Sequence, residues 1–374
     1  MKVAGIMTLL NINKAVIVLS QWMALLCSII ILTACQTVPH SIEKVTGEPV
    51  EIKELENFVS HRMEELNVPG LSLAVINDGE IVYQGAFGVK NRSTGEKLTN
   101  QTVFEAASLS KPLFAYFVML QVKKGLIGLD EPLYQYHPNK NLLVDKRHQL
   151  ITARMLLTHT SGLPNWRKHS GAELELSFMP GTQFQYSGEG YEYLRRVLQE
   201  LLATDDDGLQ MLLEEEAVEA IGSDFMKYNW DERIPSRKAF GHRNDVPTDN
   251  HKHDHNFGAS YSLNTTAEDY AKFLVALMRP VPAKKEMVET FLKIQDQMPN
   301  EEGEMHRSLG FPVKQTEHGI RYYHSGNNGD FRAYCHFYKK RGFGVVLYSN
   351  SDKLFSSNLA EEIVEYLGDT WFYM

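Results

Sequence analysis

The spacing of hydrophobic and polar positions changes several times along the chain, and each spacing predicts a different element. Apolar residues recur at helical intervals in "GEPVEIKELENFVSHRMEEL", residues 47–66. Residues 69–88 alternate like two strands around the turn sequence at 77–79, Asn-Asp-Gly. A long, mostly apolar helix is then predicted from Ser108 to Lys124. A glycine follows it directly and marks its end.

Strand patterns return only after residue 305, in "SLGFPV", "IRYYHSG", "DFRAYCHFY" and "GFGVVLYSN", before a final amphipathic helix, "SSNLAEEIVEYLG". Strands at both ends with helical pieces between them predict an α+β fold. In this fold an antiparallel sheet is built from both termini and flanked by helices, with a mostly helical region inserted. We expect a domain over 47–374, with its α/β part at about 47–107 and 256–374 and its helical part at about 108–255.

The first 35 residues have the pattern of an export signal, because positive charge precedes the apolar run "AVIVLSQWMALLCSIIILTAC". The run ends in Leu-Thr-Ala-Cys35, which resembles the lipobox of bacterial lipoproteins, where this cysteine carries the lipid. We therefore expect a signal peptide at 1–35, a tether at 36–46, and a lipid-anchored protein of the cell envelope that faces the periplasm, on the outer membrane if the cell is Gram-negative. An uncleaved membrane anchor is the alternative, since about 18 apolar residues can span a bilayer.

Composition limits the classes of partner. The 374 residues are 43% hydrophobic and 23% charged, which is typical of a globular protein, and the formal net charge is −9. No long run rich in lysine and arginine is present, which argues against binding to nucleic acid. The expected partners are small molecules or short peptides, besides the membrane that the lipid would contact.

Ser108 and Lys111 are the first candidates for chemistry. Side chains three positions apart lie on the same side of a helix, so the amine can reach the hydroxyl. A serine needs a base to become a nucleophile, and a lysine can serve when its surroundings favour the neutral amine. These two residues alone are weak evidence for catalysis, and they also fit a helix-capping serine with a lysine that reaches toward solvent.

The surrounding segment, "FEAASLSKPLFAYFVMLQVKKGLIGLDEPL", resembles the nucleophile segment of the serine β-lactamase-related hydrolases. This family includes class C β-lactamases, D-Ala-D-Ala carboxypeptidases, D-aminopeptidases and esterases. Further segments agree in the family's order: "ITARMLLTHTSGLP", "PGTQFQYSGEGYEYL", "ASYSLNTTAEDYAKFL", "YYHSGNNGDF" and "GVVLYSNSD". The resemblance covers about residues 50–370 and implies an acyl-enzyme mechanism without a cofactor.

The resemblance implies specific roles in catalysis. Ser108 matches the nucleophile and Lys111 its proton acceptor, while Tyr186 matches the tyrosine that passes protons between nucleophile, lysine and leaving group. The backbone N–H groups of Ser108 and Asn327 match the oxyanion hole, which stabilises the tetrahedral intermediate with donors aimed at its charge.

The resemblance also places His324 in the catalytic set, at the first position of the family's third motif, Lys-Thr-Gly in β-lactamases, and it implies substrate-binding roles for Ser325, Gly326 and Gly188. Two positions depart from the lactamase pattern. Gly188 replaces an asparagine whose side chain holds the substrate's acylamide group, and His324 replaces a lysine and is expected to be only partly charged near neutrality. Both departures favour a D-amino-acid peptide or a small ester over efficient β-lactam turnover. A class C-like β-lactamase and a non-catalytic penicillin- or peptidoglycan-binding lipoprotein remain the alternatives.

Other residues invite competing interpretations. The histidines of "HKHDH", residues 251–255, are typical zinc ligands, but they lie in a polar loop without strand context, and we expect no metal. Cys335 lies in an apolar strand and is expected to be a packed thiol. His159 is expected to be structural. Trp166 and Tyr261 either line the substrate cleft or simply pack.

Overall fold

The structure is a computed structural model, and it describes residues 40–372 apart from 143–144, 170, 249–255, 296–297 and 301–302. Residues 41–374 form one compact unit. The predicted signal peptide, which includes Cys35, and the "HKHDH" segment lie outside the described residues. Within the described ranges, no helix combines the length and apolar character needed to cross a membrane.

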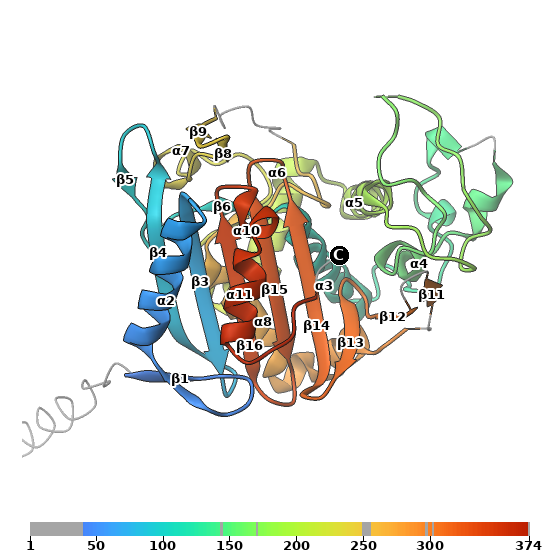
Figure 1. Cartoon of the computed structure of the whole chain (residues 1–374). Helices are drawn as coiled ribbons and strands as arrows, with labels where there is room; N and C mark the ends of the chain where they lie inside the picture. The colour runs from blue at the N-terminus through green and yellow to red at the C-terminus, as the bar shows by residue number, and fades with distance from the viewer. Residues whose placement is uncertain are drawn as a thin grey trace, which may run out of the picture. The chain divides into compact units, whose positions relative to one another are not determined.

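A nine-stranded antiparallel sheet forms the centre of this unit (Figure 1). Its order is β11 (Met298–Asn300), β12 (Gly303–Arg307), β13 (Pro312–Thr316), β14 (Gly319–Asn327), β15 (Arg332–Tyr338), β16 (Phe343–Ser349), β3 (Gly70–Asn77), β4 (Glu80–Asn91) and β5 (Glu96–Lys97). Strand β16 pairs with β3, with Leu347 opposite Leu73, so strands from the two ends of the chain meet in the middle. The predicted α+β fold with a sheet built from both termini is confirmed.

The hairpin predicted at residues 69–88 is also confirmed. Strands β3 and β4 pair from Asn77 and Glu80 outward. The two residues between them, Asp78 and Gly79, have φ angles of 49° and 68°. Two-residue turns with positive φ match the right-handed twist of paired strands, which explains why Asp-Gly occurs here.

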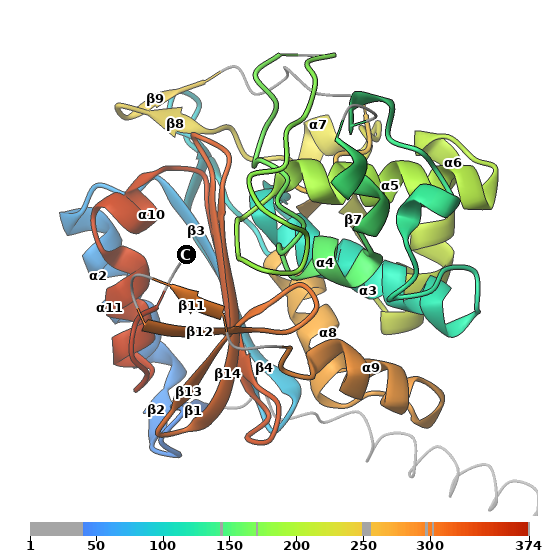
Figure 2. The same cartoon turned by 90° about the vertical axis from the view of Figure 1, so that its right-hand side faces the viewer.

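Helices cover both faces of the sheet (Figure 2). On one face, α2 (Ile52–Glu65) and α11 (Leu359–Tyr366) pack on alternate residues of β3: Leu71, Leu73 and Val75. Ala74 and Ile76, which point the other way along the same strand, belong to the core of the opposite face. Because side chains alternate along a strand, β3 is buried on both sides and reads as a continuous apolar run.

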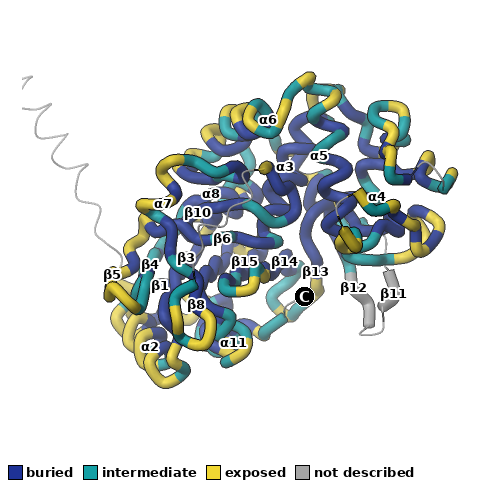
Figure 3. Tube along the Cα trace, turned by 90° about the horizontal axis from the view of Figure 1, so that it is seen from above, coloured by how far each residue is buried: buried dark blue, intermediate teal, exposed yellow. Residues whose placement is uncertain are grey.

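The opposite face carries α3 (Ser110–Lys123), α8 (Ala267–Met278) and α9 (Lys285–Leu292). The remaining helices are α4 (Ala153–Leu157), α5 (Gly188–Leu202), α6 (Asp206–Leu213), α7 (Ile234–Arg237) and the short α10 (Lys353–Ser356). Residues 110–121 of α3 are buried, so this helix runs through the interior, while exposed positions gather on the outside of α2 and on β5 (Figure 3). A helix that is apolar on every side is stable only inside the protein.

The N-terminal strands correct one prediction. Residues 36–46 were predicted to be a tether, but β1 (Ser41–Glu43) pairs with β2 (Pro49–Glu51). Ile42 and Val45 are buried in the core beneath α2. Residues 41–46 therefore belong to the folded domain, because Ile42 and Val45 pack against its hydrophobic core.

Three further small strands hold the start of α3. Strand β10 (Asn264–Thr265) lies between β6 (Phe104–Glu105) and β7 (Met226–Lys227). A last pair, β8 (His242–Arg243) and β9 (Val246–Pro247), forms a separate hairpin. The small central sheet brings residues 104–110 and 260–265 together, and the candidate site is built on these two segments.

Candidate active site

Ser108 lies in a single 3₁₀ turn, η1 (Ala107–Leu109), immediately before α3. Its residue is partly exposed, whereas Ala107 and Leu109 are buried. The backbone N–H of Ala106 donates to the carbonyl of Leu263 at 2.8 Å, which fixes the turn to the neighbouring segment. Ala107 has a φ of 49°, an unfavourable conformation for an alanine that the surrounding structure must hold in place.

Lys111 is brought to Ser108 as the spacing predicts. Its side chain is buried, and Nζ lies 3.3 Å from Ser108 Oγ. Nζ also donates to the backbone carbonyl of Ser260 at 2.8 Å. The amine therefore has a fixed direction, and it lies within contact distance of the only part of Ser108 that can act as a nucleophile.

Tyr186 joins this pair from the other side. The Lys111 Nζ atom lies 4.7 Å from the centroid of the Tyr186 ring. Ser187 follows and caps α5, since its Oγ accepts from the Gly190 N–H at 2.9 Å. The helix cap thus fixes the backbone next to Tyr186, a residue distant in the sequence that lies beside the neighbouring pair Ser108 and Lys111.

His159 holds Tyr186 in position. Its ring packs on the tyrosine ring with centroids 4.4 Å apart, and its Nδ1 accepts from the backbone N–H of Ser187 at 3.1 Å. Burial lowers the pKa of His159 well below its ordinary value, so the imidazole is neutral and can accept this bond. These contacts agree with the predicted structural role.

The third motif lies at the end of β14, beside the nucleophile turn. A Cβ added to Gly326 would lie 2.6 Å from the carbonyl oxygen of Ala106 and 3.0 Å from the Cβ of Ala107. Only a glycine allows the strand to approach this closely. Ser325 is buried and Asn327 is exposed, so the strand passes from the interior to the surface next to Ser108.

Asn328, which follows the motif, ties the end of β14 to its neighbours. Its Nδ2 donates to Glu105 Oε2 at 2.8 Å and to the backbone carbonyl of Tyr261 at 3.2 Å. The other oxygen of Glu105 pairs with the buried Lys238 at 2.6 Å. Through Asn328, the strand, the nucleophile segment and the 260–263 segment are held in one arrangement.

His324 differs from the expectation for it. The sequence predicted a histidine that is partly charged near neutrality, but the side chain is fully buried. Burial, and then the nearby positive charge of Lys111, lower the pKa of His324 to about 3. Its Nδ1 lies 2.8 Å from the carbonyl oxygen of Ser325. This histidine is therefore neutral at physiological pH and supplies no positive charge for a substrate carboxylate.

The same burial predicts loss of stability in acid. The folded pKa of His324 lies below the ordinary value of about 6.5, so the unfolded chain binds the extra proton first as the pH falls. Stability from this residue is complete above pH 6.5 and is lost towards pH 3, with about 2 kcal/mol gone at pH 5. Urea unfolding at several pH values should show this slope, and His324→Gln should flatten it. An unchanged slope in the variant would contradict the prediction.

Gly188 is enclosed by an aromatic side chain. A Cβ added there would lie 2.9 Å from Cη2 of Trp166 and 3.0 Å from the carbonyl oxygen of Asn165. Trp166 is half exposed and packs edge-on against Tyr261, with ring centroids 5.7 Å apart. The indole thus takes the space that a side chain at position 188 would use.

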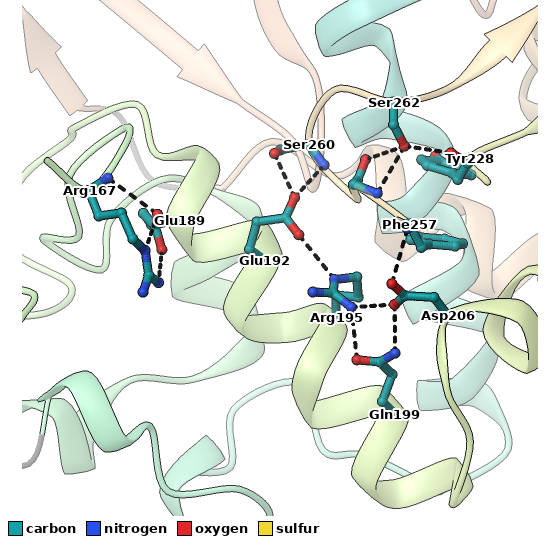
Figure 4. Close-up of polar contacts among 11 residues, drawn as sticks. Arg167, Glu189, Glu192, Arg195, Gln199, Asp206, Tyr228, Phe257, Ser260 and Ser262 are labelled. Atoms are coloured by element: carbon teal, nitrogen blue, oxygen red, sulfur yellow. Dashed lines mark hydrogen bonds and ion pairs between the residues drawn. The ribbon is translucent and has the colours of Figure 1, made fainter. Parts of the chain in front are cut away.

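A polar network around Glu192 connects Ser260 to Arg195 and Asp206 (Figure 4). The carbonyl that accepts from Lys111 belongs to Ser260, whose N–H and Oγ both donate to Glu192 Oε1, at 3.1 and 2.8 Å. The second oxygen of Glu192 accepts from Arg195 at 3.0 Å, and Arg195 also pairs with Asp206. Helix α5 therefore positions the residue that orients the amine.

The sequence did not single out Glu192, Ser260, Glu105 or Asn328 for these contacts. Each lies inside or directly beside a segment that carries the family resemblance, which is the only signal that indicates them. Arg307 was missed as well, and its signal is a charged residue directly before the apolar stretch "SLGF".

In the parts of the chain that the structure describes, no group of three or more histidine, cysteine, aspartate or glutamate side chains could hold a metal ion. Cys335 is fully buried in β15, and burial raises the pKa of its thiol. It packs as predicted and is a poor nucleophile.

Comparisons with known proteins identify the family. A family model described as Beta-lactamase matches residues 55–367. The chain therefore belongs to the β-lactamase family, and the resemblance found in its motifs is confirmed.

Two relatives show the range of similarity. Esterase EstB of Burkholderia gladioli is 30% identical in an alignment 161 residues long, which covers 36% of this chain and 41% of the esterase. Protein flp of Staphylococcus aureus (strain MW2) is 20% identical in an alignment 333 residues long, which covers 83% of this chain and 65% of that protein. The matched region spans less than two thirds of the length of either relative.

Solved structures share the fold. The octameric penicillin-binding protein homologue from Pyrococcus abyssi has a TM-score of 0.74 at 22% identity and covers 86% of this chain and 78% of its own. D-alanine carboxypeptidase AmpC from Burkholderia cenocepacia has a TM-score of 0.71 at 19% identity, with 84% and 98% covered. At these identities the similarity establishes the fold, and the substrate must be argued from the site.

Proposed function

We propose that the protein is a serine hydrolase that cleaves an amide or ester through an acyl-enzyme. Ser108 Oγ forms a bond to the substrate carbonyl carbon while its proton passes to Lys111 and Tyr186. The proton then goes to the leaving nitrogen or oxygen, the bond from that atom to the carbon breaks, and water later releases the acyl group. The backbone N–H groups of Ser108 and Asn327 hold the oxyanion.

One observation carries this proposal: Lys111 Nζ lies 3.3 Å from Ser108 Oγ and 4.7 Å from the ring of Tyr186. A surface lysine that only reached toward solvent would not be buried between a hydroxyl and a phenol. The Glu192–Ser260 network, which fixes the direction of the amine, supports the same conclusion.

We infer that a D-amino-acid peptide or a small ester is a better substrate than a β-lactam. Position 188 offers no side-chain amide, and Trp166 fills the space beside it. His324 is neutral, so the third motif holds no cation for a carboxylate. The likeness of part of the chain to esterase EstB favours the ester of these two classes.

Covalent labelling tests the proposal. The purified chain is incubated with a fluorophosphonate and, separately, with a penicillin, and its intact mass is measured. We expect a single fluorophosphonate adduct, which peptide mapping places on Ser108. A panel of short-chain esters, D-peptides and β-lactams then ranks the substrates. Absence of any adduct would favour the alternative of a binding lipoprotein, and rapid turnover of β-lactams alone would favour a lactamase.

We also propose that the protein is exported and anchored to the cell envelope by a lipid on Cys35. The apolar leader and the lipobox-like Leu-Thr-Ala-Cys support this placement. Labelled palmitate fed to expressing cells should be incorporated into the wild-type chain and not into Cys35→Ala. Equal incorporation into both chains would refute the anchor.

A further inference from the structure

Arg307, the last residue of β12, is a buried charge that the proposed mechanism does not yet use. Its residue is only 5% exposed, and its guanidinium lies over the ring of Phe184, 4.2 Å from the centroid. Phe184 is two residues before Tyr186, and His159 packs against both rings, at 6.1 and 4.4 Å. The arginine therefore belongs to the cluster of side chains that surrounds the tyrosine.

The charges in this cluster interact. Burial lowers the pKa of Arg307 to about 10, and of the groups that oppose this change Tyr186 has the largest effect, followed by Tyr323 and Tyr191. A guanidinium with a pKa of about 10 still carries its charge at neutral pH. That charge also lowers the pKa of His159. Arg307 thus acts electrostatically on Tyr186 and on the histidine packed against it.

The other titratable groups around Tyr186 are either uncharged or already have a role in the proposed proton transfer. Lys111 approaches Tyr186 from α3. His159 and, on β14, His324 have lowered pKa values and are neutral, and burial raises the pKa of Tyr191 on α5. Arg307 is therefore the positively charged group of this cluster that takes no part in the proposed proton transfer.

We propose that Arg307 is a positioning residue that stabilises the negative charge of the Tyr186 oxygen while this oxygen accepts the Ser108 proton. It supplies from β12 the positive charge that the neutral His324 does not supply from β14. This inference rests on the proposed function. No new bond is invoked, because Arg307 acts through its charge and Tyr186 transfers the proton as described above.

A pH profile of Arg307→Met tests the inference. For hydrolysis of a chromogenic ester at neutral pH, we expect kcat/KM to fall roughly 10- to 100-fold, because fewer molecules hold Tyr186 ready to accept a proton. The acidic limb of the profile should move to higher pH by about one unit or more, and the loss should shrink in alkali. Arg307→Lys, which keeps a cation, should stay close to the wild-type limb. A loss of the same size at every pH would overturn the inference.

Arg154 provides a matched control for Arg307. Arg154 and Arg307 both line a cavity of about 170 Å³, together with Thr160. The Arg154 guanidinium is bound to Asp130 and Gln295 at 2.6 Å each. Its charge is therefore already paired, and Arg154→Met should leave the position of the acidic limb unchanged. A shift of the limb in this control equal to that of Arg307→Met would also overturn the inference.

The cavity permits a chemical rescue. Millimolar guanidinium chloride should raise the kcat/KM of Arg307→Ala at least about tenfold, whereas urea at the same concentration should not raise it. Equal restoration by urea, or none by guanidinium, would overturn the inference. If the wild-type chain forms no adduct at Ser108, the proposed function itself has failed. If the adduct forms and the pH profile of Arg307→Met does not shift, the role of Arg307 alone is wrong.

Discussion

Ser108→Ala is expected to lower kcat/KM for a chromogenic ester by roughly 10⁴-fold or more, because the proposed acyl-enzyme forms on the hydroxyl that this change removes. The methyl group fits wherever the hydroxymethyl group fits, so the fold should be retained. Steady-state hydrolysis measures the rate, and thermal unfolding checks that the variant is folded. Equal rates for the two proteins would remove the mechanism.

Ser110→Ala is a suitable control for this measurement. This serine is two positions away, but its hydroxyl is turned into the protein, where it donates to the Ala107 carbonyl and accepts from the Leu263 N–H at 3.0 Å. Its loss should reduce stability by about 1–3 kcal/mol while the labelling of Ser108 by the fluorophosphonate continues. A variant that is folded and yet unlabelled would show that the hydroxyl of Ser110 takes part in the chemistry.

The parts of the fold that the sequence predicted are those with local signals. The helix over 108–124 and the hairpin around Asp78 are encoded by residues within a few positions of each other. The sheet that joins both ends of the chain could be predicted from the number and order of the strand-like segments alone. The tether was wrong because the burial of Ile42 and Val45 depends on α2, which the pattern of residues 36–46 does not contain.

The candidate site likewise has parts that the local sequence predicts and parts that depend on tertiary contacts. Ser108 and Lys111 are three positions apart, and the segments with family resemblance supplied Tyr186 and the end of β14. The hydrogen bond from Lys111 to Ser260 spans 149 positions and ends on a backbone carbonyl, which leaves no mark in the residue type. The charge of His324 was wrongly predicted because it depends on burial by elements distant in the sequence. The position of Trp166 beside Gly188 also depends on tertiary packing, so the local sequence does not predict it.

Asp369→Ala is expected to destabilise the fold by about 3–5 kcal/mol, because it leaves a buried arginine without its counter-charge. Arg321 and Asp369 have side chains that are 0% and 1% exposed, with Nη1 and Oδ1 3.4 Å apart. Tyr338 donates its hydroxyl to the same carboxylate oxygen at 2.9 Å. Chemical denaturation with a fixed m-value measures the loss.

Two further variants separate the buried charge from other causes of this loss. Arg62 and Glu362 form a partly exposed pair at 2.6 Å between α2 and α11, and Glu362→Ala should cost only up to about 1 kcal/mol. The double variant Arg321→Met with Asp369→Leu removes both buried charges and should recover most of the stability lost by Asp369→Ala. If the double variant is less stable than Asp369→Ala, an unpaired guanidinium is not the cause, and the loss comes from the other contacts of Asp369, with Tyr338, His336 and the Thr370 N–H.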